Sequence, residues 1–488
     1  MKSPRYCLIP TSSSWTSPSD ALQIRETLRA TFKKGTTRPI EWRQRQLKQL
    51  VKMCQEKYED FYEALQIDLG KPRVEVLLGE VGAVIARATK SEQQVAEWAK
   101  PEHPEVHGEH AKWNPTVHKA PRGTVLIISP WNYPIILTLQ PLIGAIAAGC
   151  CAVVKPSEHV PTFAQKLALF LPDYLDRSAY QVVNGEAGVA QKLLGLQWDH
   201  IFYTGGGRVA RIIARAAAEH LTPMTLELGG KSPVVIDDKY DVELAAKRIL
   251  WGKCNNAGQI CVAPDYILCP RNIQAKLVSA FSEHYRKFFP EGALKSDDFG
   301  KIVNDAHVER LTSLIKDTKG TIVLGGNHDG RKLEPTIVQD VEEGDPLLED
   351  EIFGPILPIV PVDSLDDAIR FIQARPHPLV LYAFTDNDDF KGRLINETQS
   401  GGIAFNDTFQ QLAVNELPFG GVGESGYGYQ IMKYTFDTFT QLRSAVDVPK
   451  GSETDMERRY PPHNKEAIKA MAPIVLQTSE HPAANGRF

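Results

Sequence analysis

The chain contains 488 residues, which is too many for a single hydrophobic core, so two or three domains are expected. Hydrophobic residues make up 42% and charged residues 24% of the sequence, as in ordinary soluble globular proteins. The formal net charge of −5, with no basic stripe, argues against a nucleic-acid partner.

The first 19 residues are expected to form an irregular tail. They contain the basic residues Lys2 and Arg5, and no acidic residue precedes Asp20. Mitochondrial transit peptides carry more basic residues than this, so we expect a cytoplasmic protein, with mitochondrial import as the weaker alternative. No apolar run reaches the roughly 18 residues that cross a bilayer, so no integral membrane segment is expected.

Residues 20–228 are predicted to form a cofactor-binding domain. Amphipathic helices fill its first part, over Ala21–Phe32 and Trp42–Ala64. Short apolar runs and helical segments then alternate from Gly123 onward, which predicts a doubly wound parallel α/β sheet. The expected strands are 124–128, 151–154, 180–183 and 200–203, and the expected helices are 141–149, 162–171, 189–194 and 208–220.

A second alternating series predicts an α/β catalytic domain over residues 229–423. Residues 110–122 and 435–448 are predicted to be β-ribbon or edge strands, the latter within a return and oligomerisation segment at 424–448. Residues 449–488 are charged and contain prolines, which predicts an irregular tail. The strands expected in the second series are 234–236, 266–268, 321–324, 356–362 and 379–385, and the expected helices are 242–251, 273–288 and 365–374.

The seven cysteines show neither a C-x-x-C pair nor a His-rich spacing, so no metal site is expected. Free thiols in a reducing compartment are the simplest explanation. Most of them are expected to be small buried hydrophobes.

Three polar residues in separate segments supply the groups needed to oxidise an aldehyde. Cys261, in the run NNAGQIC, is a thiol that can attack a carbonyl carbon. Asn132, in SPWNYP, can donate to the resulting oxyanion together with the backbone N–H of Cys261. Glu227, in LELGGKSP, can activate water, and burial among its apolar neighbours should raise its pKa. Because side chains alternate between the two faces of a strand, the position of Glu227 between two leucines would by itself predict an outward-facing residue.

Two strand ends are candidate contacts for a dinucleotide cofactor. After Thr204, residues Gly205 and Gly206 begin the run GGGRVA, which fits G-x-G-x-x-A and opens a helix whose free N–H groups favour a pyrophosphate. A plain tight turn explains that run equally well. Lys155 and Glu158 follow another strand, where they could hold the adenosine ribose or form a solvated ion pair. A carboxylate there would repel a 2′-phosphate, which favours NAD over NADP.

These segments, together with APDYILC, LPFGGVG and RYPP, resemble the aldehyde dehydrogenase superfamily, in particular its class 3 branch of fatty- and aromatic-aldehyde enzymes. The resemblance implies that Cys261 is the nucleophile, that Glu227 is the general base and that Asn132 holds the oxyanion. It implies that both strand ends bind NAD or NADP. In the run EDEIFGP, it implies that Glu351 holds the nicotinamide ribose and that Phe353 packs near the ring. It also implies a homodimer bridged by a β-ribbon.

The predicted function is NAD(P)-dependent oxidation of an apolar aldehyde (long-chain, aromatic or apocarotenoid-like) to its carboxylic acid. Tyr133, Trp251, Phe405 and Phe419 could line an apolar tunnel for this substrate, although such aromatics are also common in cores. A CoA-acylating dehydrogenase is the first alternative, and it would lack the water-activating Glu227. A cofactor-binding protein without activity is the second alternative, and it would lack the nucleophile or the base.

Overall fold

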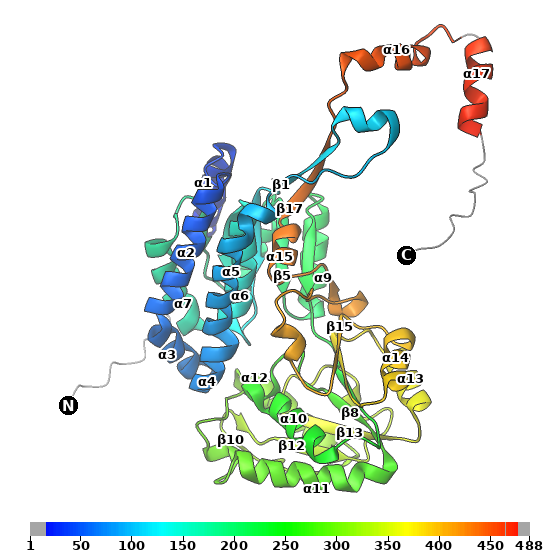
Figure 1. Ribbon diagram of the computed structural model, residues 1–488. Coiled ribbons are helices and arrows are strands. Elements are labelled where there is room, and N and C mark those ends of the chain that lie inside the picture. Colours follow the sequence, from blue (N-terminus) through cyan, green and yellow to red (C-terminus); the bar gives the residue numbers. More distant parts are fainter. Residues whose placement is uncertain (1–15, 464, 477–488) are drawn as a thin grey trace. The chain divides into compact units, whose positions relative to one another are not determined.

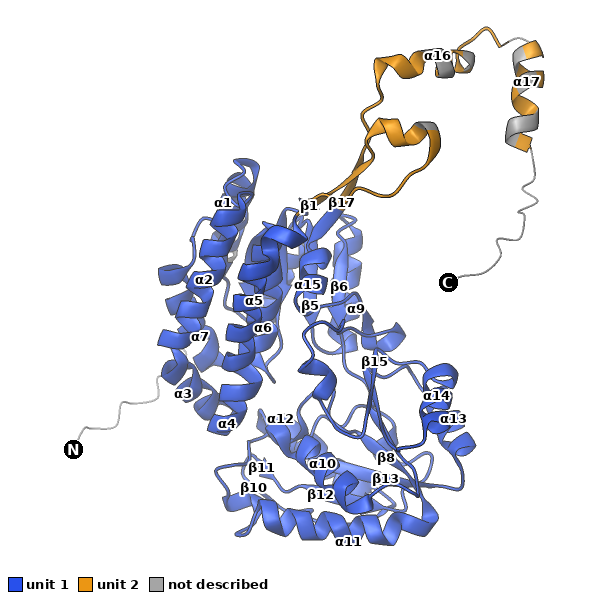
Figure 2. Ribbon diagram, viewed as in Figure 1, with its two compact units in different colours: residues 1–99, 120–441 blue, residues 100–119, 442–488 orange. Residues whose placement is uncertain are grey.

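The computed structural model describes residues 16–463 and 465–476. The chain forms two compact units, one within residues 1–99 and 120–441 and one within residues 100–119 and 442–488 (Figure 2). Parts of the two predicted tails, namely residues 1–15, 464 and 477–488, lie outside the described residues, as does Cys7. No helix in the described parts of the chain is long and apolar enough to span a membrane.

The first unit begins with a group of helices, which confirms the helical character predicted for Ala21–Phe32 and Trp42–Ala64. The first helix starts where the Ser17 hydroxyl accepts a hydrogen bond from the backbone N–H of Asp20. The second buries Leu47 and Leu50, three residues apart, against the rest of the unit. The helices are α1 (Pro18–Lys33), α2 (Ile40–Glu56), α3 (Tyr58–Leu69), α4 (Arg73–Glu75), the π-helix η2 (Val76–Gly82) and α5 (Ala83–Trp98).

The first sheet has six strands in the order β16–β6–β5–β2–β3–β4. Its strand β5 is labelled in Figure 1. All strands of the sheet run parallel except β16, which is antiparallel to β6. Because the chain moves outward from β2 to β4 and then returns to β5, the strand order reverses beside β2, where such sheets bind ligands beyond the carboxyl ends of their strands. The strands are β2 (Thr124–Ile128), β3 (Cys151–Lys155), β4 (Tyr180–Val182), β5 (His200–Thr204), β6 (Met224–Glu227) and β16 (Gly426–Tyr427).

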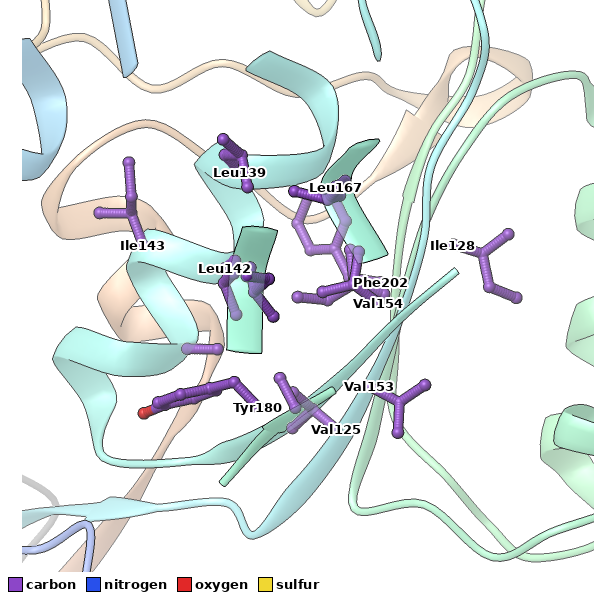
Figure 3. Packing of buried hydrophobic residues seen from close by; sticks show 14 of the residues in the cluster. Val125, Ile128, Leu139, Leu142, Ile143, Val153, Val154, Leu167, Tyr180 and Phe202 are labelled. Atoms are coloured by element: carbon purple, nitrogen blue, oxygen red, sulfur yellow. The ribbon is translucent and has the colours of Figure 1, made fainter. Parts of the chain in front are cut away.

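The first buried hydrophobic cluster lies between the first sheet and the helices that cover it. Leu139 and Leu142 of α6 and Leu167 of α7 gather around Phe202 of β5, while Val153 points to the opposite face of the sheet (Figure 3). The connecting helices are α6 (Pro134–Ala148), α7 (Pro161–Tyr174), α8 (Ala187–Leu194) and α9 (Gly207–Ala218).

Helix α6 begins at Pro134, so the prediction that it starts at Pro141 was wrong. Pro134 occupies the first turn, where proline is favoured, and Pro141 lies inside the helix. Nearly every residue of α6 is buried, and this packing outweighs the local cost of an internal proline.

The second sheet has seven strands in the order β15–β14–β7–β8–β13–β12–β9, and only β9 is antiparallel to its neighbour. A second buried cluster surrounds it.

The doubly wound α/β fold is therefore confirmed, whereas the domain boundaries at residues 228 and 423 stay predictions because both sheets lie within one compact unit. The strands are β7 (Pro233–Ile236), β8 (Tyr266–Pro270), β9 (Thr321–Leu324), β12 (Thr336–Gln339), β13 (Ile356–Val362), β14 (Val380–Phe384) and β15 (Gly402–Phe405), beside a hairpin of β10 (His328–Asp329) and β11 (Lys332–Leu333). The helices are α10 (Val242–Cys254), α11 (Arg271–Phe288), α12 (Asp305–Asp317), α13 (Leu365–Gln373) and α14 (Asp388–Glu397).

A two-stranded sheet pairs β1 (Thr116–Pro121) with β17 (Thr440–Ala445), within the segments predicted to form a ribbon. Each of those segments also contains helical residues, in a 3₁₀ turn at Gly108–Trp113 and in α15 (Lys433–Thr438). The tail predicted to be irregular contains α16 (Glu453–Met456) and α17 (Lys465–Leu476). The sequence of α17 is rich in lysine, alanine and other good helix formers, which explains this difference.

Candidate active site

Asn132 lies in the loop between β2 and α6, and buried groups hold its backbone in place. Lys71 Nζ and Asn256 Nδ2 both donate to the Asn132 carbonyl oxygen, at 3.0 and 2.9 Å. The side-chain amide of Asn132 donates to the Gln259 carbonyl oxygen at 3.0 Å. An amide nitrogen carries two hydrogens, so Asn132 can donate the second one to an oxyanion.

Glu227 ends strand β6, and its side chain is 2% exposed. Burial raises the pKa of Glu227 to about 7, against smaller opposing effects of hydrogen bonds from Thr204, Cys261 and Gln430. The Thr204 hydroxyl donates to Oε2 at 3.3 Å, and the Gln430 amide donates to the same oxygen. The other oxygen, Oε1, faces the thiol of Cys261. Glu227 is thus a carboxyl group able to gain or lose a proton near neutral pH.

Cys261 follows a tight turn at the end of α10, in which Asn256 and Ala257 both have left-handed backbone angles. Its Sγ donates to Glu227 Oε1 at 3.8 Å. Burial and the carboxyls of Glu227 and Glu351 raise the pKa of the Cys261 thiol well above its usual value. The thiol therefore needs a base to become a nucleophile, and the carboxylate of Glu227 is in position to take its proton.

The side chains of Asn132, Glu227 and Cys261 line one cavity of about 840 Å³. Its wall is largely apolar and comes from α4, η2, α5, α6, α10, α11 and the loops near residues 409–431. Three of the four aromatic residues predicted to form a tunnel lie in this wall, whereas Phe405 packs against the second buried cluster. The apolar side chains of the wall include Val74, Leu78, Tyr133, Ile136, Leu137, Trp251, Ile260, Phe288, Phe409, Leu412, Phe419 and Ile431.

Lys155 and Glu158 lie at the end of β3, and Lys155 Nζ binds Glu158 Oε2 at 2.8 Å. They form an ion pair in which Lys155 is buried and Glu158 is partly exposed, so it is not the solvated pair of one predicted alternative, and the ribose contact stays a prediction. Although partial burial alone would raise it, the pKa of Glu158 is lowered by Lys155, so the carboxylate is ionised at neutral pH. A small pocket lies beside this pair, lined by Pro156, Ser157, Glu158, Pro161, Ala164, Gln165, Asn184 and Gly185.

The N-terminus of α9 fits the pyrophosphate of a dinucleotide. Gly206 caps this helix without any side-chain hydrogen bond, so its first N–H groups are not capped by a side chain. A Cβ atom added at Gly206 would meet nothing within 4 Å, so the approach to these groups is open. Gly205 precedes this cap, whereas the hydroxyl of Thr204 turns to Glu227. Thr204 thus contacts a catalytic candidate, although it was predicted to contact the cofactor.

Glu351 and Phe353 lie in the segment between the 3₁₀ turn Pro346–Leu348 and β13. Burial raises the pKa of Glu351 to about 8, and its Oε1 has no hydrogen-bond partner among the described residues. This carboxyl also raises the pKa of the Cys261 thiol, and its unpaired buried oxygen fits a ribose hydroxyl of a bound cofactor. Phe353 has a left-handed φ of 47° and packs edge-on against Trp131, with ring centroids 5.3 Å apart. Within the described part of the chain, no cluster of residues could hold a metal ion.

Several residues of the site were missed from the sequence. Lys71 and Glu80 form a fully buried ion pair with Nζ and Oε1 2.6 Å apart, and Arg87 lines the cavity. Gln430 contacts Glu227 from a position 203 residues further along the chain. A lysine and a glutamate in a helical region usually belong to a solvated surface, so only the tertiary contacts reveal their role.

A family model described as the aldehyde dehydrogenase family matches residues 13–445. The chain belongs to this family. The dog protein named "Aldehyde dehydrogenase, dimeric NADP-preferring" is 42% identical over 442 residues, covering 90% of this chain and 97% of the relative. The mouse "Aldehyde dehydrogenase family 3 member A2" is 43% identical over 443 residues, 90% of this chain and 91% of the relative. "4,4'-diaponeurosporen-aldehyde dehydrogenase" of Staphylococcus aureus is 42% identical, covering 86% of this chain and 92% of the relative.

Solved structures of aldehyde dehydrogenases share the fold. The substrate-bound state of Staphylococcus aureus AldH gives a TM-score of 0.86 at 41% identity, covering 88% of this chain and 94% of that one. An aldehyde dehydrogenase of Mycobacterium tuberculosis, complexed with NAD⁺, gives 0.80 at 27% identity, covering 90% of this chain and 92% of that one. The prediction that the protein is an NAD(P)-dependent aldehyde dehydrogenase with a class 3-like sequence is confirmed.

Proposed function

We propose that the protein oxidises an apolar aldehyde to the carboxylic acid through a thioester on Cys261. One observation carries this proposal: a thiol, a buried carboxyl and an amide donor line the same apolar cavity, with Cys261 Sγ 3.8 Å from Glu227 Oε1. A CoA-acylating enzyme would share the thiol step but would have no use for a base that activates water at this place. A protein without activity would have no reason to keep a thiol and a base in contact.

The first step is the attack of the Cys261 sulfur on the aldehyde carbon. The thiol proton passes to Glu227 Oε1, a carbon–sulfur bond forms, and the carbonyl oxygen becomes negatively charged. The side-chain amide of Asn132 and the backbone N–H of Cys261 then donate to that oxygen. Each such donor is typically worth about 10²–10³ in rate when it is already aimed at the developing charge.

NAD(P)⁺, when bound, would supply the acceptor for the hydride that leaves the tetrahedral carbon. Lys155 and Glu158 would hold its adenosine ribose, the N-terminus of α9 its pyrophosphate, and Glu351 its other ribose, with Phe353 nearby. Cys261 is left in a thioester. Glu227, once its first proton has been lost to solvent, takes a proton from water, whose oxygen attacks the thioester carbon while the electron pair of the carbon–sulfur bond returns to Cys261.

The wall of the cavity supports the substrate class. Its side chains are mainly aliphatic and aromatic, so burying a long or aromatic hydrocarbon tail there is favourable by roughly 25 cal/mol per Å². The relative named for 4,4'-diaponeurosporen-aldehyde agrees with this choice. We therefore propose long-chain, aromatic or apocarotenoid-like aldehydes as substrates.

A panel of aldehydes of increasing chain length, assayed with NAD and with NADP, tests this function. We expect reduced cofactor to appear fastest with the apolar aldehydes, free acid as the product even when CoA is present, and no turnover in Cys261→Ala. Cys269→Ala, which removes a buried thiol of β8 outside the cavity, is the matched control and should keep its activity. Undiminished turnover in Cys261→Ala would refute the proposal.

We also propose a cytoplasmic homodimer. The pairing of β1 with β17 supplies a ribbon able to extend a neighbouring sheet, and one relative is named as dimeric. Sedimentation of the purified chain should give twice the mass of 54.2 kDa, and cell fractionation should place the protein in the cytoplasmic fraction.

A further inference from the structure

Gln430 is the one glutamine with a hydrogen bond to Glu227 among the described residues. It comes from the loop after β16, is 3% exposed, and lines the cavity with Glu227 and Cys261. Its Nε2 donates to Glu227 Oε2, the oxygen that also accepts from Thr204. Its own oxygen, Oε1, is buried and has no hydrogen-bond partner among the described residues.

The backbone around Gln430 is held in an unfavourable conformation. Ile431 and Met432 have φ of 83° and 50°, in the region that favours glycine, and Ile431 is β-branched. Hydrogen bonds enforce this turn: Gln430 N donates to Phe419 O at 2.7 Å, and Ile431 N donates to Thr435 Oγ1 at 2.8 Å. Strain of this kind persists only where the surrounding structure imposes it, and it is common at functional sites. Here the strained residues directly follow Gln430, whose amide donates to Glu227.

A buried acceptor without a partner is unfavourable, and a water molecule satisfies it where the site is polar and has room. The proposed hydrolysis needs a water molecule at this place, beside Glu227 Oε1 and the carbon bonded to Cys261. That water has two hydrogens but loses only one to the base. The second hydrogen needs its own acceptor if the oxygen lone pair is to point at the thioester.

We propose that Gln430 is a catalytic residue of the hydrolytic step, in which its Oε1 accepts the second hydrogen of the attacking water while its Nε2 fixes Oε2 of the general base. This inference rests on the proposed function. Glu227 Oε1 takes one hydrogen as a proton, the water oxygen bonds to the thioester carbon, and the electron pair of the carbon–sulfur bond leaves with Cys261. The second hydrogen stays on the new carboxyl oxygen and ionises to solvent. Hydride transfer precedes these events. Gln430 contacts none of the atoms that react in it, and Thr204 still holds Glu227 Oε2 when Gln430 is replaced.

Gln430→Met tests the proposal, because methionine has a similar length and no hydrogen-bonding amide. We expect single-turnover formation of reduced cofactor at the wild-type rate, a burst of about one equivalent, and steady turnover about 10- to 100-fold slower. Hydroxylamine should restore turnover, because it attacks the thioester without a general base and releases the acyl group as a hydroxamic acid with the thiol of Cys261. In Gln430→Glu, the second carboxyl should move the rising limb of the kcat profile to higher pH.

Gln274→Met is the matched control, because the Gln274 amide also donates to a carboxylate, Asp340, and also has an unpaired oxygen, outside the cavity. It should keep wild-type turnover without a burst. Slower single-turnover hydride transfer in Gln430→Met, or a turnover that hydroxylamine does not restore, would overturn the role of Gln430. Failure of the proposed function is distinguishable, because it would appear in the wild-type enzyme as the absence of a trappable acyl group on Cys261.

Discussion

Replacing Lys71 by methionine should weaken the whole site, although Lys71 makes no contact with the reacting atoms in the proposed mechanism. Lys71 and Glu80 are each 0% exposed, and their Nζ and Oε1 atoms lie 2.6 Å apart. Lys71 also donates to the Asn132 carbonyl oxygen and lies over the Tyr133 ring. Glu80 Oε2 accepts from the backbone N–H groups of Ile135 and Ile136, in the first turn of α6. The pair thus fixes both ends of the turn that carries Asn132.

The size of the effect follows from the burial of both charges. At 2.6 Å and an effective dielectric constant of about 20, their attraction is about 6 kcal/mol, which offsets the cost of removing two charges from water. Lys71→Met leaves Glu80 buried and unpaired, and breaking such pairs typically costs about 3–5 kcal/mol. Replacing Glu80 by glutamine as well should recover more than half of this loss, because the glutamine oxygen can still accept from the backbone of α6.

The stability loss should depend on pH. Without Lys71, desolvation raises the pKa of Glu80 further above its unfolded value, since the cation that opposed this effect is gone. A raised folded-state pKa means that the folded variant binds a proton more readily than the unfolded chain, so its stability rises as pH falls through that value. The deficit of Lys71→Met should therefore be largest at alkaline pH and shrink on acidification towards the ordinary carboxyl range.

Urea denaturation followed by tryptophan fluorescence measures these changes, with Lys52→Met as the control for an exposed ion pair. The Lys52–Glu56 contact is 3.7 Å long with both partners about half exposed, so its loss should leave the denaturation midpoint unchanged. If Lys71→Met were as stable as the wild type, or if the double variant were less stable than Lys71→Met, the buried pair would not be what holds the Asn132 turn.

Three further predictions concern the reaction itself. Because burial raises the pKa of Glu227 to about 7, kcat should fall about tenfold per pH unit below that value under hydrolysis-limited conditions, and a profile flat to pH 5 would exclude Glu227 as the base. Asn132→Ala should slow single-turnover hydride transfer by about 10²–10³ while leaving binding of NAD, followed by fluorescence titration, unchanged. Glu158→Gln should lower the KM for NADP relative to that for NAD, because it removes the negative charge proposed to face the 2′ position, and an unchanged ratio would place the 2′ position elsewhere.

Much of the architecture could be predicted from local patterns. Short apolar runs between helices predicted the bounds of β2, β3 and β5 to within a residue or two, because strands that are buried on both faces are continuously apolar. The start of α6 was misplaced, because the buried environment that tolerates Pro141 is set by tertiary packing. Helix α17 was missed for a different reason. Charge and proline content predicted an irregular chain, but the segment contains many residues with a high helix propensity.

The candidate catalytic residues could be named from the sequence because each lies in a distinctive segment. Their partners could not, since Gln430 reaches Glu227 across 203 residues and Lys71 reaches Asn132 across 61. A glutamine or lysine in such a segment is ordinarily a surface residue, and nothing local distinguishes the exceptions. The fold brings these groups together from different elements: Glu227 ends β6, Gln430 follows β16, and Lys71 lies between α3 and α4.

The two oxygens of Glu227 have different neighbours, and this difference explains how one carboxyl can serve both proton transfers of the proposed reaction. Oε2 is held by Thr204 and Gln430, so only Oε1 is turned to Cys261 and to the attacking water. A carboxyl of ordinary pKa would be a poor acceptor for the thiol proton, whereas one with a much higher pKa would not release that proton before hydrolysis. Burial raises the pKa of Glu227 to about 7, and the hydrogen bonds to Oε2 oppose any further rise. The apolar cavity that accepts the substrate thus also sets the basicity that its oxidation requires.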